Sequence, residues 1–202
     1  MNTVLAVDTA SATIALALSV DGRVTAASVA DGAQDHSRLL LPAIRDLLQG
    51  RLDELTAIVA VRGPGSYAGL RVGIATARAL ALARGIPAFG VPTLEAVAAA
   101  AGPGDFTAVH PAGRGTFAAQ AYSGGNAAGP LYSAPAADLA GLTLAGEGAS
   151  ALGGREVTPA DRCRAALESV LPRLDGPPGP LEALYLREPT ISLPRRATER
   201  PA

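Results

Sequence analysis

The apolar positions in the first half of the chain fall into two kinds of segment. Short, nearly continuous apolar runs bounded by turn residues predict buried strands, over residues 3–8, 12–20, 23–29, 57–61 and 86–91. Longer segments with apolar residues three or four positions apart predict helices, over residues 37–49, 69–84 and 93–101. Asp21-Gly22 predicts a tight antiparallel turn between the second and third strands. Strands that then alternate with helices predict an α/β fold with a partly parallel sheet.

The pattern changes at Gly102-Pro103-Gly104, where apolar runs become shorter and glycine and proline more frequent. Beyond this point the sequence predicts two strands, an amphipathic helix and a break, at residues 106–110, 115–122, 160–171 and 176–180. The chain is therefore divided into an N-terminal lobe, a smaller C-terminal lobe and a loose tail, at residues 1–101, 102–193 and 194–202. At the helix starts, Asp35 or Ser37 is expected to cap the first helix, and Thr93 the third.

The composition excludes several kinds of chemistry. All 17 basic residues are arginine, so neither a Walker A loop nor a Schiff-base lysine can be present. Two histidines and one cysteine, Cys163, are too few for the usual first shell of a zinc site, and the sequence predicts no metal site, although the composition leaves a carboxylate-held Mg²⁺ open. The formal net charge of −1 gives no bulk attraction to nucleic acid. With a single cysteine and no apolar run long enough to span a membrane, we expect a cytoplasmic protein.

The glycine-rich segment between the strand at 57–61 and the helix at 69–84 is the most distinctive local motif. A strand, a tight loop and a helix start direct backbone N–H groups and the positive end of a helix dipole into one concavity, where an anion can bind. The residues of this predicted anion- or nucleotide-binding loop are Asp8, Gly63, Gly65, Ser66, Gly69 and Arg71. The alternative interpretation is that the glycines serve only a sharp turn and close packing, and that Asp8 caps its own turn.

Small residues recur every four positions along the helix after this loop, at Gly69, Gly73, Ala77 and Ala81. They lie on one face, where another helix can approach closely, and the stripe of Leu40, Ile44 and Leu47 on the first helix is a candidate companion.

Five local motifs occur in the order in which one protein family carries them. They are Val7-Asp8-Thr9-Ala10, Asp35-His36-Ser37, the loop from Gly63 to Gly73, Val91-Pro92-Thr93-Leu94-Glu95-Ala96 and Leu184-Tyr185-Leu186-Arg187. Together they resemble the TsaB family, most closely over residues 1–101. The resemblance implies one lobe of the actin, Hsp70 and sugar-kinase fold, which is ribonuclease H-like, with a reduced second lobe.

The resemblance also implies a function without catalysis. TsaB proteins are the non-catalytic partners of TsaD, a catalytic paralogue, and act with the ATPase TsaE to make threonylcarbamoyladenosine at position 37 of tRNA. The implied contact is a four-helix one, which a homodimer can imitate, through Leu40, Ile44, Leu47, Gly69, Gly73 and Ala77. No cofactor of its own is implied; ATP or ADP with Mg²⁺ would bind at the surface shared with the partner, and tRNA through the complex.

Several features depart from this family or leave other functions open. The catalytic relative needs two metal-binding histidines on its first helix, whereas this chain has His36 followed by Leu40. His110-Pro111-Ala112-Gly113-Arg114 stands where an Asp-Ala-Arg-like turn is common. In the wider fold, an acidic residue in the position of Asp8 approaches a metal–phosphate site, so an independent ATP-dependent enzyme is one alternative. A peptidase with Ser66 as nucleophile is another. Arginines in the tail could contact tRNA phosphates, at Arg187, Arg195, Arg196 and Arg200.

Overall fold

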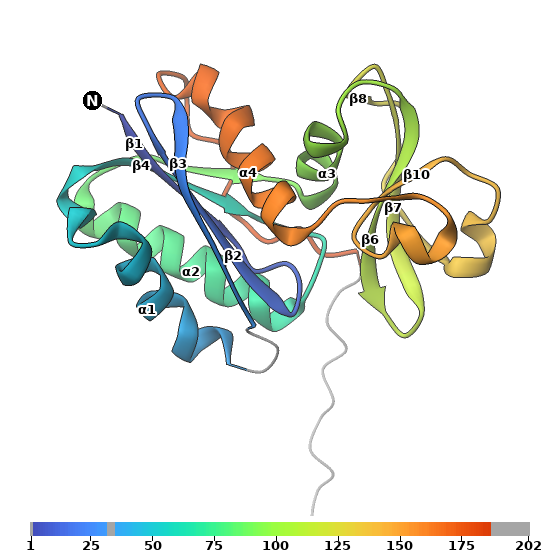
Figure 1. The fold of residues 1–202 in the computed structure, drawn as a ribbon, viewed down its shortest axis with the longest axis horizontal. Helices are drawn as coiled ribbons and strands as arrows, with labels where there is room; N and C mark the ends of the chain where they lie inside the picture. Colours follow the sequence, from blue (N-terminus) through green and yellow to red (C-terminus); the bar gives the residue numbers. More distant parts are fainter. Residues whose placement is uncertain (1, 32–34, 187–202) are drawn as a thin grey trace, which may run out of the picture.

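The computed structural model describes residues 2–31 and 35–186, and these form two lobes built on two β-sheets (Figure 1). The first sheet has the strand order β3-β2-β1-β4-β5 and the second the order β11-β10-β6-β7-β8, with β9 paired to β7. This arrangement confirms the predicted α/β class and the two lobes. The tail from Arg187 onward, with its four arginines, lies outside the described residues.

The first sheet combines an antiparallel meander with two parallel additions. Its strands are β1 (Thr3–Asp8), β2 (Thr13–Val20), β3 (Arg23–Asp31), β4 (Leu55–Val61) and β5 (Ala88–Val91). The first three strands pair antiparallel, and β1, β4 and β5 pair parallel. The helices are α1 (His36–Leu48), α2 (Tyr67–Arg84), α3 (Thr93–Ala101) and α4 (Pro159–Val170), and a short 3₁₀ turn, η1 (Arg51–Glu54), precedes β4. All of these strands and helices were predicted from the apolar pattern to within a few residues.

The second sheet is made of shorter strands, β6 (Asp105–Gly113), β7 (Thr116–Ser123), β8 (Asn126–Ala127), β9 (Tyr132–Pro135), β10 (Leu144–Gly146) and β11 (Arg155–Glu156). Only β6 and β7 were predicted. Three 3₁₀ turns complete the described chain, η2 (Ala136–Leu139), η3 (Ala149–Leu152) and η4 (Leu171–Arg173). None of the helices in the described ranges has the length and apolarity needed to cross a membrane.

The central strand β1 is buried on both faces, and its alternate residues enter two different cores. Val4 and Ala6 pack on the side of α4, together with Ala166 and Leu167. Leu5 and Val7 pack on the opposite side with the buried residues of α1, which are Leu40, Ile44 and Leu48. The first sheet is therefore covered by α1 and α2 on one face and by α4 on the other (Figure 1).

The path of α4 corrects the predicted lobe boundary. The chain does enter the second lobe at Gly102-Pro103-Gly104, but residues 102–193 do not form one lobe, because α4 returns to pack against β1, β2 and α3. Residues after it continue along the first lobe, where the backbone N–H of Leu184 donates to the carbonyl of Arg62 over 2.7 Å.

The predicted helix caps are also corrected. Asp35 precedes α1 without a side-chain capping bond, because its carboxylate pairs with Arg38, and Ser37 lies inside the helix. Thr93 is the first residue of α3, and its backbone N–H donates to the carbonyl of Gly63 over 2.8 Å. Ser66 and Thr158 do cap their helices, by accepting from the N–H groups of Gly69 and Asp161.

The stripe of small residues on α2 faces inward, against the sheet. A Cβ on Gly69 would overlap the carbonyl oxygen of Thr9, and one on Gly73 would overlap the Thr9 hydroxyl. Ala77 and Ala81 pack with Ile58 and Ala60 of β4. Leu40 and Ile44 are buried as well. The structure therefore contradicts the predicted partner interface for five of its six residues, and only Leu47 is partly exposed.

Gly73→Ala should therefore destabilise the chain, although Gly→Ala in an open helix usually stabilises. We expect a loss of about 2 kcal/mol in the free energy of unfolding, measured by urea denaturation, because the added methyl group overpacks the contact with Thr9. Gly129→Ala is the matched control, since its Cβ would lie 3.7 Å from the Cβ of Ala121, an ordinary contact. Equal stability of the two variants would contradict the close packing of α2 on Thr9.

Candidate functional site

The loop between β4 and α2 is held against the turn that follows β1. The N–H of Ser66 donates to the carbonyl of Ala10 over 2.7 Å, and the Thr9 hydroxyl donates to the carbonyl of Gly69 over 2.8 Å. Gly63 has a φ of +107° and lies so close to the carbonyl of Leu184 that a side chain would not fit. These contacts favour the interpretation that the glycines serve a turn and close packing.

The residues predicted to bind an anion do not gather around one site. Asp8 is fully buried and faces α4, where it pairs with Arg162. Arg71 is exposed on α2, where it donates to the Tyr67 hydroxyl over 2.7 Å and lies over the Tyr67 ring. The N–H of Gly69 is already capped by Ser66. Asp8 is therefore not part of the predicted loop site.

Ser66 also lacks the surroundings of a nucleophile. Its hydroxyl accepts from Gly69, and both histidines bond elsewhere: His36 to the carbonyl of Ser11 over 3.0 Å, and His110 to the carbonyl of Ala10 over 3.2 Å. A triad needs a base within hydrogen-bond reach of the nucleophile. His36 is only 7% exposed, so its side chain is held within the chain.

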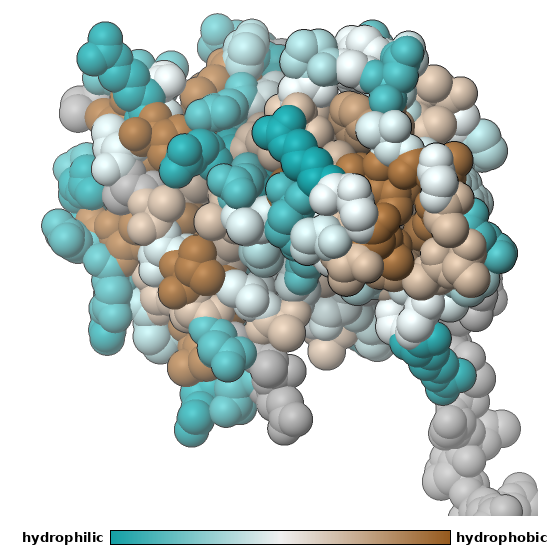
Figure 2. Space-filling view, turned by 45° about the vertical axis from the view of Figure 1, so that its right-hand side comes forward, coloured by the Kyte–Doolittle hydropathy of each residue, from teal (hydrophilic) through white to brown (hydrophobic). Residues whose placement is uncertain are grey.

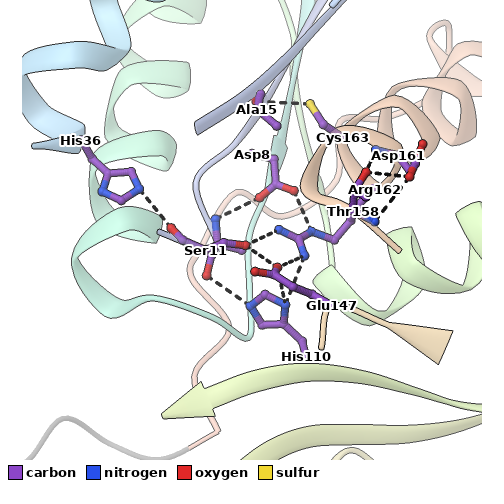
Figure 3. Close-up of polar contacts among 11 residues, drawn as sticks. Asp8, Ser11, Ala15, His36, His110, Glu147, Thr158, Asp161, Arg162 and Cys163 are labelled. Carbon is purple, nitrogen blue, oxygen red and sulfur yellow. Dashed lines mark hydrogen bonds and ion pairs between the residues drawn. The ribbon is translucent and has the colours of Figure 1, made fainter. Parts of the chain in front are cut away.

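The polar centre of the molecule is a cluster around Arg162, which the sequence did not predict (Figure 3). Arg162 lies on α4 with its side chain 0% exposed. Its Nε donates to Asp8 Oδ2 over 2.7 Å, and its Nη1 donates to Glu147 Oε2 over 2.8 Å. Nη1 also approaches His110 Nδ1 at 3.2 Å, and Nη2 donates to the Ser11 hydroxyl over 2.8 Å. We call these five residues the Arg162 cluster.

The cluster joins the two lobes. Asp8 and Ser11 come from the first lobe, at the end of β1 and in the turn after it. His110 lies on β6 of the second lobe, and Glu147 follows β10 of the same lobe. Ser11 also donates to Glu147 directly across the boundary.

The charges within the cluster determine the protonation of its members. Burial alone would lower the pKa of Arg162, but Asp8 and Glu147 outweigh it and raise that pKa. Burial raises the pKa of Glu147, and the nearby Arg162 and Ser11 reverse the shift and lower it. Burial and the charge of Arg162 lower the pKa of His110 to about 4. His110 is therefore neutral at pH 7: its Nδ1 accepts from Arg162, and its Nε2 donates to Ala10.

A signal for part of this cluster was present in the sequence. The buried residues of α4 recur at helical spacing, and an arginine stands among apolar ones, at Arg162, Cys163, Ala166, Leu167 and Val170. An arginine on the apolar face of a helix indicates a buried partner, although the sequence does not say which residue it is.

A pocket of about 260 Å³ lies where the loop meets the second lobe. Its lining includes Pro64, Tyr67 and Tyr185 from one side, and Arg114 and Thr116 from the β6–β7 turn. The rings of Tyr67 and Tyr185 have centroids 5.2 Å apart. On the side that Figure 2 shows, hydrophilic side chains are widely scattered, and apolar ones gather toward the right, on the second lobe.

The outer surfaces of α1 and α2 form a second candidate site. The two helices pack side by side, and each has a row of half-buried residues at a spacing of four. All of them except one threonine are apolar: Leu39, Ala43 and Leu47 on α1, and Val72, Thr76 and Leu80 on α2. We call these six residues the outer helix face.

Stability should depend on pH through His110. In the unfolded chain its pKa returns to about 6.5, so between pH 6.5 and about 4 the unfolded chain binds one more proton, and stability falls as the pH falls. We expect a loss of about 2 kcal/mol between pH 7 and pH 5. Glu147, whose pKa is lowered, adds a further loss only below its usual pKa of 4.5. Urea denaturation of the wild type and of His110→Asn between pH 7 and 5 checks this. The free energy of unfolding should change less with pH in the variant than in the wild type, and an equal change in both would contradict the prediction.

The sequence is similar to those of several known proteins. A family model described as TsaD, tRNA N6-adenosine threonylcarbamoyltransferase, matches residues 22–143. The tRNA threonylcarbamoyladenosine biosynthesis protein TsaB of Bacillus subtilis is 37% identical over 100 residues, covering 48% of this chain and 44% of that protein. An uncharacterized protein of Mycobacterium leprae is 36% identical over 201 residues, covering 94% of this chain and 56% of its own length. The matches thus span about half the length of these relatives.

A solved structure agrees with the fold. YeaZ from Pseudomonas aeruginosa superposes with a TM-score of 0.69 at 24% identity, covering 92% of this chain and all of that one. The likeness extends over both lobes and confirms the two-lobed α/β fold.

Proposed function

Because the chain belongs to the TsaB/YeaZ family, we propose that it is a non-catalytic subunit that holds and activates a TsaD-type catalytic paralogue. The complex would make threonylcarbamoyladenosine at position 37 of tRNA, together with a TsaE-type ATPase. The chain would reach tRNA through the complex, in the cytoplasm, and ATP or ADP with Mg²⁺ would bind at the shared surface.

The observation that best supports this proposal is the outer helix face. Its largely apolar rows run along two neighbouring helices and are only half covered by the chain itself. A helix pair of a related fold can pack its own ridges into the groove between α1 and α2. A stable contact of this kind buries on the order of 1,600 Å² and depends on a few apolar anchors.

The proposed contact differs from the one that the sequence suggested. Gly73 and Ala77 pack on the sheet, so a bulky charge at either position would disrupt the fold before it tested any interface. Ala43 lies between Leu39 and Leu47 in the row on α1 and is half-buried. It is therefore a better position for the test.

The Arg162 cluster supports a role without turnover. A metal-dependent ATPase needs carboxylate oxygens that are free to bind the cation. Asp8 accepts from Arg162 and from the N–H of Ala10, so both of its oxygens are already used within the chain.

Ala43→Arg should abolish association with the TsaD-type partner while leaving the chain folded, because it places a charge in the middle of the apolar row on α1. Co-purification would test association, and a tRNA modification assay omitting each subunit in turn would test function. Ala99→Arg, exposed on α3, is the matched control and should retain both.

Light scattering of the free chain completes this test. A homodimer through the same face would be lost in Ala43→Arg and kept in Ala99→Arg. Normal association and modification by a folded Ala43→Arg chain would refute the proposed contact, and modification without this subunit would refute the proposed function.

A further inference from the structure

A single guanidinium fills the place where acidic side chains of both lobes converge. Arg162 contacts Asp8 of the first lobe and Glu147 of the second, with all of its nitrogens engaged and its side chain fully buried. The planar fork of arginine suits this geometry, because its N–H groups point in several fixed directions in one plane. The helix that carries Arg162 packs on the first sheet, so the contact with Glu147 ties that helix to the second lobe.

These residues do not fit a metal-bound nucleotide. The Mg²⁺ that accompanies a nucleotide requires oxygen ligands, and the two carboxylates nearest to the guanidinium already accept charge-assisted hydrogen bonds from it. A second cation placed there would be repelled by a buried positive charge. Within the ranges that the structure describes, no group of three or more His, Cys, Asp or Glu side chains is arranged to hold a metal ion.

We propose that Arg162 is a built-in cation that takes the place of a metal ion between the lobes and clamps them in one relative orientation. The chain then neither binds a metal-bound nucleotide at this position between the lobes nor opens and closes around one. The proposal depends on contacts within the chain, so it stands or falls independently of any partner.

Chemical rescue tests the clamp directly. Arg162→Ala leaves the buried carboxylate of Asp8 and the partly buried one of Glu147 without a cation, and we expect its melting temperature to fall by about 10 °C. Arg164→Ala, an exposed position on the same helix, is the control and should melt like the wild type. Methylguanidinium should raise the melting temperature of Arg162→Ala alone, because it can enter the vacated position, whereas elsewhere guanidinium ions only weaken folding.

Distances between the lobes give a second measurement. Spin labels at Ala79→Cys on α2 and Ala137→Cys on η2 occupy exposed positions in different lobes, while Cys163 is buried and its pKa is raised by burial. The wild type should give one narrow distance distribution and Arg162→Ala a broad one. If Arg162→Ala does not fold, Arg162→Lys replaces it, since lysine keeps the charge without the planar fork, and a broader distribution is again expected.

Two results would overturn the proposal. One is a narrow, unchanged distance distribution in the Arg162 variant, together with a melting temperature equal to that of Arg164→Ala. The other is stabilisation of the wild type by Mn²⁺ or Mg²⁺ with ATP that disappears in Asp8→Asn, because it would show that the position between the lobes accepts a metal-bound nucleotide despite Arg162.

Discussion

The ion pairs of Arg162 with Asp8 and Glu147 are the interaction on which the arrangement of the two lobes depends. A buried charge is tolerated only when partners replace the water that it loses. Arg162 meets this condition with partners from both lobes, including the neutral ring of His110 and the hydroxyl of Ser11. After forming the second sheet, the chain returns to the first one with α4. This helix supplies both an apolar face for β1 and β2 and the cation that pairs with carboxylates of both lobes.

Most of the fold could be predicted from the sequence because its larger elements have local signals. The strands of the first sheet are nearly continuous apolar runs, and α1 and α2 carry a helical repeat, so their positions follow from spacing alone. The short strands β8 to β11 have two to four residues each and show no periodicity. They exist because a neighbouring strand offers an edge for pairing: β7 for β8 and β9, β6 for β10, and β10 for β11. This information is absent from any local window.

The candidate site was harder to predict because its contacts are distant in sequence. Arg162 and Asp8 are separated by 154 positions, and nothing near either residue identifies the other. The stripe of small residues on α2 shows a different limit of prediction from sequence. Spacing indicated correctly that Gly69, Gly73 and Ala77 share a face, but it could not say whether the sheet or a partner covers that face. The structure shows that the chain itself covers it: Ala77 lies against β4, and Gly73 against Thr9 in the turn after β1.

The fully engaged carboxylate of Asp8 and the inward-facing small residues of α2 both support the proposed role in binding a partner rather than in catalysis. A carboxylate at the end of β1 could serve chemistry only if one of its oxygens faced a ligand, and Asp8 is saturated by α4 and by its own turn. Once the inner faces of α1 and α2 are used by the sheet, the half-covered and largely apolar rows on their outer side still have surface to bury against a partner. A rigid body held at its centre by Arg162 can present such a surface without reorganising, and this lowers the entropic cost of binding a partner.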